Sequence, residues 1–313
     1  MRNSKYWDDF ALRLNETVGA IDNNTSPPVR RVAVFITDRC NFRCQYCNGQ
    51  FNSKTMSKET FEDIVYKYGD SAIIHITGGE PSVVPWLYDY LKTHGEYCRF
   101  HLNTNAYFKP PALSVKRLKI SLDSCNDKYW NNLVGRKYAF ERVVEHIKYS
   151  IPRTVVSLTY TVTKQNYGDV IEFANFCQKE FAGLYAIFFS VYKGTNENFA
   201  MSNSEVDEFF DIIIPDLLPH LNQESQYLLK ETIDEKRRLM QGVRFEQKNT
   251  NGICYLSMSE RVFSPDGQEF TCSHLYRDKI YMKKPLKHDK CKYGCNQRLV
   301  AFNNEVERIL NCS

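Results

Sequence analysis

The stretch RVAVFITDRCNFRCQYC, residues 31–47, joins a β-branched apolar run to a loop that holds three cysteines. The run 31–37 is typical of a buried strand. Cys40, Cys44 and Cys47 follow it directly, and so short a loop can bring three thiolates to one metal centre. An iron–sulfur cluster fits three thiolates, and a zinc ion with a distant fourth ligand is the alternative.

Strand and helix patterns alternate after this point. We expect strands at 31–37, 72–77, 99–105, 117–123, 154–163 and 184–192, and helices at 57–69, 84–95, 139–150 and 167–181. This alternation predicts a parallel sheet with helical crossovers. Since six strands are fewer than the eight of a closed barrel, the expected fold class is α/β, as an open or partial (β/α)6 barrel.

One face of four successive predicted strands is polar. Its members are His75, Thr77, Gly79, His101, Asn103, Asn105, Lys119, Ser121, Asp123, Ser157, Thr159, Thr161 and Thr163. Because crossover helices cover the outer face of such a sheet, a polar inner face predicts an interior that receives a ligand. A half-solvated sheet is the alternative. Chemistry is expected at the carboxyl ends of the strands.

The turn GGEP, residues 78–81, ends the second predicted strand, 31 residues after Cys47. Neighbouring parallel strands place this turn beside the cysteine loop. Paired glycines let a ligand approach the backbone closely, and Glu80 offers a carboxylate to an amine. The combination favours a cluster with an open iron beside an amino-acid-binding turn.

The region from 35 to 193 contains four motifs: CNFRCQYC, GGEP, NTN (103–105) and ISLDS (120–124). Through these motifs the region resembles the radical SAM superfamily. The resemblance implies that Cys40, Cys44 and Cys47 hold a 4Fe–4S cluster at which S-adenosylmethionine binds. In this family a 5′-deoxyadenosyl radical then abstracts a hydrogen atom from the substrate. The cofactor-binding residues that the resemblance implies are Tyr46, Gly78, Gly79, Glu80, Pro81, Asn105, Ser121 and Asp123.

A second cysteine group lies near the C-terminus, at Cys254, Cys272, Cys291 and Cys295. A PDG turn at 265–267 predicts a hairpin before Cys272. Four thiols fit a zinc site or another iron–sulfur cluster. The spacing resembles the Twitch/SPASM-like extension of radical SAM enzymes, although its C-x2-C-x5 part is missing. The resemblance implies one auxiliary 4Fe–4S cluster, with Cys312 as an alternative ligand.

An auxiliary cluster with four protein ligands can accept an electron from a substrate radical. The expected reaction is therefore an oxidation, either dehydrogenation or bond formation, on a small molecule or a peptide. This step needs a base, for which His75, His101 and Lys119 are candidates.

Two alternatives to this oxidation stay open. One is a redox-neutral epimerisation, rearrangement or methyl transfer, and a thiol of Cys98, Cys125 or Cys177 in the interior would favour epimerisation. The other is a non-catalytic Fe–S redox sensor or nucleic-acid-binding protein. GGEP and ISLDS argue against this second class, since a sensor has no need of S-adenosylmethionine contacts.

The composition of the 313 residues, 42% hydrophobic and 25% charged, is that of a globular chain. A net charge of +4 permits an anionic substrate without predicting nucleic acid as a partner. There is neither a signal-peptide pattern nor an apolar run of roughly 18 residues, so we expect a cytoplasmic protein without membrane contact. Eleven cysteines in a reducing compartment favour metal ligation over disulfides. An electron donor such as flavodoxin or ferredoxin is expected.

We divide the chain into a lead-in (1–30), a radical SAM partial barrel with trailing helices (31–245) and an auxiliary-cluster domain (246–313). The trailing helices are expected at 203–221, kinked or ended by Pro215, and at 225–242. About thirty residues before the first strand are too few for a leader-recognition domain, which favours a small-molecule substrate over a peptide.

Overall fold

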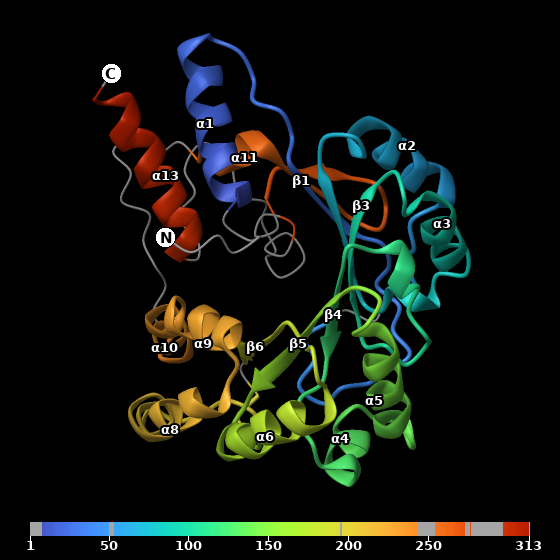
Figure 1. Cartoon of the computed structure of the whole chain (residues 1–313), viewed down its shortest axis with the longest axis vertical. Helices are drawn as coiled ribbons and strands as arrows, with labels where there is room; N and C mark the ends of the chain where they lie inside the picture. Colours follow the sequence, from blue (N-terminus) through green and yellow to red (C-terminus); the bar gives the residue numbers. More distant parts are fainter. Residues whose placement is uncertain are drawn as a thin grey trace.

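The computed structural model of the chain describes residues 8–49, 53–194, 196–242, 254–272, 276 and 297–312. At its centre is one eight-stranded sheet with the order β6-β5-β4-β3-β2-β1-β7-β8 (Figure 1). Its strands are β1 (Arg31–Phe35), β2 (Ile73–Thr77), β3 (Arg99–Thr104), β4 (Arg117–Ser121), β5 (Val155–Val162), β6 (Ala186–Val191), β7 (Glu260–Phe263) and β8 (Glu269–Phe270). All neighbours pair in parallel except β7 and β8. The six predicted strands are confirmed, and the fold is a mostly parallel α/β sheet.

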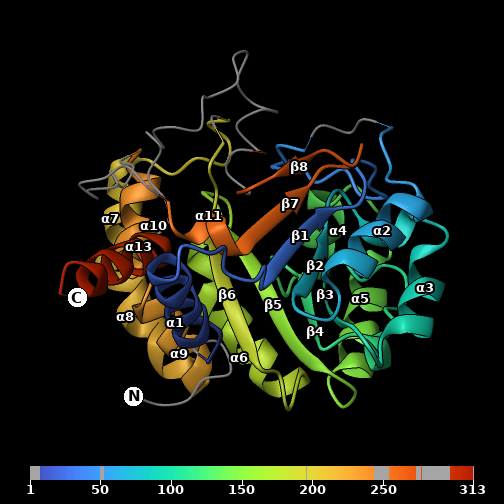
Figure 2. The ribbon, with the colours of Figure 1, turned by 90° about the horizontal axis from the view of Figure 1, so that it is seen from above.

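The crossover helices lie on the outer face of the curved sheet (Figure 2). They are α2 (Lys58–Tyr68), α3 (Leu87–His94), α4 (Asp127–Leu133), α5 (Ala139–Ser150) and α6 (Val170–Glu180). The Ser57 hydroxyl caps α2 by accepting the Thr60 N–H. The Asn126 side chain does the same for α4 through the Tyr129 N–H. Helix α4 was not predicted, because at seven residues it is too short to show an amphipathic period.

The two faces of the sheet differ as the strand patterns predict. Ile74, Ile76, Leu102 and Ile120 have no exposed surface, because they pack against the crossover helices. Their alternating neighbours on the concave face, such as His75 and Lys119, keep partial exposure. The concave face is therefore the polar face, and it is available to a ligand.

The segment after β6 forms four short helices: α7 (Asn203–Glu208), α8 (Ile214–Leu217), α9 (Gln223–Lys230) and α10 (Ile233–Met240). A π-helical turn, Phe209–Ile213, precedes Pro215, as expected where proline removes a backbone donor. The single helix predicted at 225–242 is two helices. At the break, the Thr232 hydroxyl donates to the Leu228 carbonyl oxygen over 2.8 Å.

The N-terminal and C-terminal segments lie side by side, as both views show. Helix α1 (Asp8–Asp22) packs on α11 (Leu256–Ser259) and α13 (Gln297–Leu310). Arg13 of α1 donates to the Ser259 hydroxyl over 3.0 Å and to the Glu260 carboxylate over 3.2 Å. The expected lead-in 1–30 thus contains a helix that supports the C-terminal segment.

The predicted C-terminal hairpin is confirmed as β7 and β8, which pair antiparallel. The sequence did not predict that β7 also pairs in parallel with β1 and so extends the catalytic sheet. The division at 245 stays a prediction, since Cys291 and Cys295 lie outside the described residues. Among the helices that the structure describes, none has the length and apolarity needed to cross a membrane.

Candidate active site

The cysteine loop lies at the carboxyl end of β1, at the sheet edge where β2, β3 and β4 also end. Backbone hydrogen bonds hold the loop against the segment that follows β4. The Arg43 N–H donates to the Val134 oxygen and the Gln45 N–H to the Leu133 oxygen, each over 2.9 Å. The loop conformation is therefore built by contacts far apart in the sequence.

The three thiols of this loop differ in exposure. Cys40 and Cys44 are partly buried, and Cys47 is exposed. Burial raises the pKa of the Cys40 thiol to about 11, and it raises the pKa of Cys44 further. Both sulfurs therefore need a bound cation to become thiolates at neutral pH.

The three cysteines of the loop fit the donor set of a 4Fe–4S cluster. Within the described residues, no three His, Cys, Asp or Glu side chains come close enough together to hold one metal ion. In a 4Fe–4S cluster each cysteine binds a different iron, so the thiols need not converge on one point.

The two glycines of GGEP allow the turn to lie directly on the cysteine loop. The Gly79 N–H donates to the Thr37 oxygen over 2.7 Å, and the Glu80 N–H to the Arg39 oxygen over 2.8 Å. A Cβ on Gly78, whose φ is +142°, would lie 2.4 Å from the Thr37 oxygen. A Cβ on Gly79 would lie 2.3 Å from the Arg39 oxygen. The loop backbone thus requires both glycines, and the ligand approach expected from the sequence stays a prediction.

Glu80 braces the GGEP turn against β3. Only 1% of its surface is exposed, and burial raises its pKa. Its carboxylate accepts hydrogen bonds from the Thr104 hydroxyl and the Asn105 N–H, both over 2.6 Å, and from the Ser82 N–H over 2.9 Å. The Asn105 amide in turn donates to Asn41 Oδ1 over 2.8 Å. Three donors thus join this carboxylate to its own turn and to NTN, and the contact with an amine stays a prediction.

Tyr46 and Asp123 hold each other in place across the same edge. The Tyr46 hydroxyl donates to Asp123 Oδ2 over 2.6 Å, and the Thr161 N–H donates to Oδ1 over 2.6 Å. Burial raises the pKa of Asp123 to about 6. Ser121 is exposed on the concave face two residues earlier. The predicted cofactor residues Glu80, Pro81, Asn105 and Asp123 are buried, whereas Gly78, Gly79, Ser121 and Tyr46 have exposed surface.

Two residues of this network were not singled out from the sequence, and Thr161 was listed only as a member of the polar strand face. Asn41 and Thr104 belong to the quoted motifs CNFRC and NTN, so membership in those motifs was a usable signal. Thr161 takes part through its backbone N–H, which no side-chain pattern can indicate.

Of the second cysteine group, the structure describes Cys254 and Cys272, and both are partly buried. Cys254 precedes α11, and its sulfur accepts a contact of 3.8 Å from the Asn303 amide. Cys312 is exposed beyond the end of α13. The four-cysteine ligand set of an auxiliary cluster stays a prediction.

His75 and His101 are neighbours across β2 and β3, with ring centroids 4.7 Å apart. Burial, followed by the charges of Arg31 and Arg117, lowers the pKa of His101 to about 3 and that of His75 well below its usual value. A base with so low a pKa takes up a proton poorly at neutral pH. Lys119, the third candidate base, lies 4.5 Å from the centroid of the Phe188 ring. Which of the three acts as the base stays a prediction.

The histidine pair predicts a loss of stability in mild acid. In the unfolded chain each imidazole takes up a proton as the pH falls through about 6.5, whereas in the folded chain both stay neutral. The free energy of unfolding should therefore fall below pH 6.5 by about 1.4 kcal/mol per pH unit for each histidine. Urea unfolding at pH 7.5 and pH 5.5 measures this change. The unfolding free energy of the His75→Asn/His101→Asn variant should depend less on pH than that of wild type. An equal pH dependence in the two proteins would contradict the assignment of this effect to the histidine pair.

Residues 34–177 match the family described as the radical SAM superfamily. Among curated proteins, a GTP 3′,8-cyclase of Campylobacter fetus is 27% identical over 199 residues, which cover 58% of this chain and 61% of that protein. A GTP 3′,8-cyclase of Aliarcobacter butzleri is 32% identical over 133 residues, covering 37% and 41%. In both comparisons the match spans less than two thirds of the relative's own length.

Solved structures share the fold. Streptococcus suis SuiB bound to the precursor peptide SuiA superposes with a TM-score of 0.61 at 14% identity, covering 89% of this chain and 66% of that one. Native anSMEcpe with bound AdoMet and the Cp18Cys peptide gives a TM-score of 0.56 at 18% identity, covering 90% and 82%. At such identities the likeness concerns the fold alone. Residues 34–177, which include the cysteine loop at the carboxyl edge of the sheet, are therefore a radical SAM domain.

Proposed function

We propose that this radical SAM enzyme oxidises a small molecule with the help of two 4Fe–4S clusters. Cys40, Cys44 and Cys47 would hold the cluster that binds S-adenosylmethionine. Cys254, Cys272, Cys291 and Cys295 would hold the auxiliary cluster. The observation that carries the proposal is the convergence of the cysteine loop, GGEP, NTN and ISLDS at one sheet edge, through the Glu80 and Asp123 hydrogen bonds.

When bound, the cofactors supply a 5′-deoxyadenosyl radical and an acceptor for one electron. The electrons balance if the substrate loses one hydrogen atom to that radical, one electron to the acceptor and one proton to a base or to water. An external donor such as flavodoxin or ferredoxin would supply the electron that the radical-forming cluster needs. The same donor or a similar carrier would remove the electron that the auxiliary cluster accepts.

The protein's own residues position the reactants. The Glu80 and Asn105 hydrogen bonds hold the turn and β3 beside the cysteine loop, so S-adenosylmethionine would enter a preformed edge. The Tyr46–Asp123 contact fixes the aromatic ring beside Cys44. The exposed Ser121 hydroxyl is the group best placed to contact the ribose or the carboxylate of that cofactor.

The positions of the remaining cysteines support oxidation over epimerisation. Cys98 and Cys177 are 8% and 2% exposed and belong to the apolar core. Cys125 is partly buried against that core, with its thiol near Glu172 of α6 on the outer side of the sheet. An epimerase of this class needs a thiol that returns a hydrogen atom to the substrate, and these three are not placed for that role.

The resemblance to GTP 3′,8-cyclases, whose name specifies a nucleotide, supports a small-molecule substrate. The solved structures contain bound peptides, and a peptide recruited by a separate protein is the second candidate.

Reconstituted protein should form 5′-deoxyadenosine from S-adenosylmethionine under dithionite. Failure to form any would contradict the enzyme and favour the redox-sensor alternative.

The auxiliary cluster has its own test. The Cys254→Ala/Cys272→Ala variant should lose about four irons per chain and keep the formation of 5′-deoxyadenosine, because the first cluster does not depend on these thiols. Iron and sulfide analysis after anaerobic reconstitution measures the loss. If the wild type instead bound zinc, and the two proteins had the same iron content, the second cysteine group would be a zinc site. The argument for oxidation would then be lost.

A further inference from the structure

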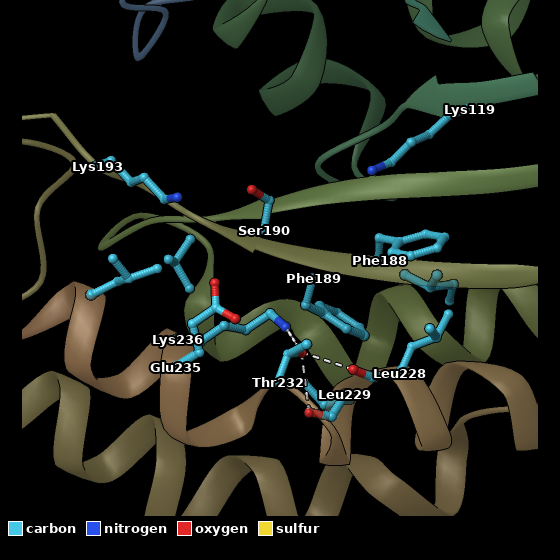
Figure 3. Close-up of a pocket in the computed structure, with 13 residues that line it drawn as sticks. Lys119, Phe188, Phe189, Ser190, Lys193, Leu228, Leu229, Thr232, Glu235 and Lys236 are labelled. Carbon is cyan, nitrogen blue, oxygen red and sulfur yellow. Dashed lines mark hydrogen bonds between the residues drawn. The ribbon is translucent and has the colours of Figure 1, made fainter. Parts of the chain in front are cut away.

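A cavity of about 310 Å³ lies beside the edge strand β6, between this strand and helices α9 and α10 (Figure 3). Its floor is apolar and includes Ile187, Phe189, Leu228 and Leu229. Its polar groups come from two sides. Lys119, Ser190 and Lys193 belong to β4, β6 and the residues just after β6, whereas Thr232, Glu235 and Lys236 belong to α10 and the residue before it.

The charged groups of the cavity are mostly cationic. Three lysines, Lys119, Lys193 and Lys236, line it together with one carboxylate, Glu235. Even with Glu235 ionised, the lining carries a net charge of +2, counted as three minus one. An oxyanion would therefore meet a favourable potential in a partly desolvated space.

Two of the lysines are held by their surroundings. The Lys236 ammonium donates to the Thr232 hydroxyl, which itself donates to the Leu228 oxygen over 2.8 Å. The Lys119 ammonium lies 4.5 Å from the centroid of the Phe188 ring. Both side chains lose less freedom on binding an anion than solvated lysines do.

The open edge of β6 adds backbone groups. The Ile187 N–H points away from β5 and donates to the Ser225 hydroxyl over 2.9 Å. Because peptide groups of alternate residues point the same way along a strand, those of Phe189 and Val191 also face this edge. Both residues line the cavity, so backbone donors lie beside the ammonium groups.

The cavity is continuous with the concave face that carries the active site. Lys119 lies on the same face of β4 as Ser121, two residues before it. Across the sheet Ser121 pairs with Thr159, which pairs with Phe188 of β6. A substrate whose reactive carbon lies near the carboxyl ends of the strands can thus place another group beside β6.

We propose that this cavity binds an oxyanion of the substrate, a phosphate or a carboxylate, through Lys193, Lys236 and Lys119. The inference rests on the proposed function and adds that the substrate is an anionic small molecule. A phosphate and a carboxylate are both oxygen-rich anions, and two probes distinguish between them. Pyrophosphate represents a phosphorylated substrate, and glutarate represents a carboxylate.

Calorimetric titration of the reconstituted protein with each probe tests the proposal. Wild type should bind one of the two anions saturably. The Lys193→Met/Lys236→Met variant should bind it about a hundredfold more weakly, since each of the two lost charged hydrogen bonds is worth about tenfold in affinity. Lys230→Met is the matched control, because Lys230 lies exposed at the end of α9 outside the cavity lining. Iron content and circular dichroism of the variants check that they fold.

Saturable binding of pyrophosphate in preference to glutarate would assign a phosphate, and the reverse a carboxylate. No saturable binding of either probe to wild type, or equal binding by the double variant, would overturn the proposal. The Cys40→Ala/Cys44→Ala/Cys47→Ala variant separates this result from the proposed function. It should bind the anion normally while forming no 5′-deoxyadenosine, because the cavity does not include the cysteine loop.

Discussion

Replacing Cys40, Cys44 and Cys47 together by alanine is expected to remove about four of about eight irons per chain and all formation of 5′-deoxyadenosine. The three thiols are the only groups of the loop with the chemistry to ligate iron, and removing them leaves the second cysteine group intact. Anaerobic reconstitution, iron and sulfide analysis, and chromatography of the reaction with S-adenosylmethionine and dithionite measure both effects.

Cys125→Ala is the matched control for this triple variant, because it removes a partly buried thiol outside both cysteine groups. It should retain the wild-type iron content and the formation of 5′-deoxyadenosine. If the triple variant kept its iron and its 5′-deoxyadenosine, the cluster could not be held by this loop. If it lost all iron, the second site would hold none, and the auxiliary cluster would be withdrawn.

Gly79→Ala is expected to separate the GGEP turn from the cysteine loop. The added Cβ would lie 2.3 Å from the Arg39 oxygen and 2.9 Å from the Asp38 oxygen. Both are backbone atoms, so the turn or the loop must move. Overpacking and the loss of the Gly79 and Glu80 hydrogen bonds should together cost about 3 kcal/mol of unfolding free energy or more. The reconstituted variant should also hold less iron, because the loop that binds it is displaced.

The matched control for this glycine is Gly168→Ala, since a Cβ at Gly168 meets nothing within 4 Å. Urea unfolding and iron analysis of the two variants measure the difference. The Gly168 variant should stay within about 0.5 kcal/mol of wild type, as surface substitutions usually do. Equal stability and equal iron content in both variants would show that the close approach of turn and loop is not needed.

The strands and the four predicted crossover helices followed from local periodicity. Each carries an alternating or helical pattern long enough to read without knowing its neighbours, as with 72–77 and 139–150. Helices α1 and α13 were not predicted from the sequence. Their burial depends on each other: Phe10 meets Phe302 with ring centroids 5.3 Å apart, although 292 residues separate them in the chain. The apolar spacing of α13 was a usable local signal, but its pairing with α1 leaves none.

The candidate site shows the same division. The cysteine spacing, GGEP, NTN and ISLDS are local patterns, and they indicated which segments meet. The roles within them depend on partners that the sequence does not name. Glu80 was expected to face an amine, which stays a prediction, but the sequence did not indicate that its carboxylate also accepts from the Thr104 hydroxyl and the Asn105 N–H. His75 and His101 stay candidates for a base, but the sequence did not indicate that burial beside Arg31 and Arg117 lowers their pKa values.

By itself the sequence determined the parallel sheet and the cysteine motif of the radical SAM domain, because both depend on residues close together in the chain: the period of apolar residues, and three cysteines within eight positions. Only the tertiary structure decided that β7 joins the sheet beside β1 and that the two glycines serve the loop backbone. It also showed that three lysines line one cavity beside β6. Those outcomes depend on distances and desolvation between groups brought together by folding, and neither quantity exists along an extended chain.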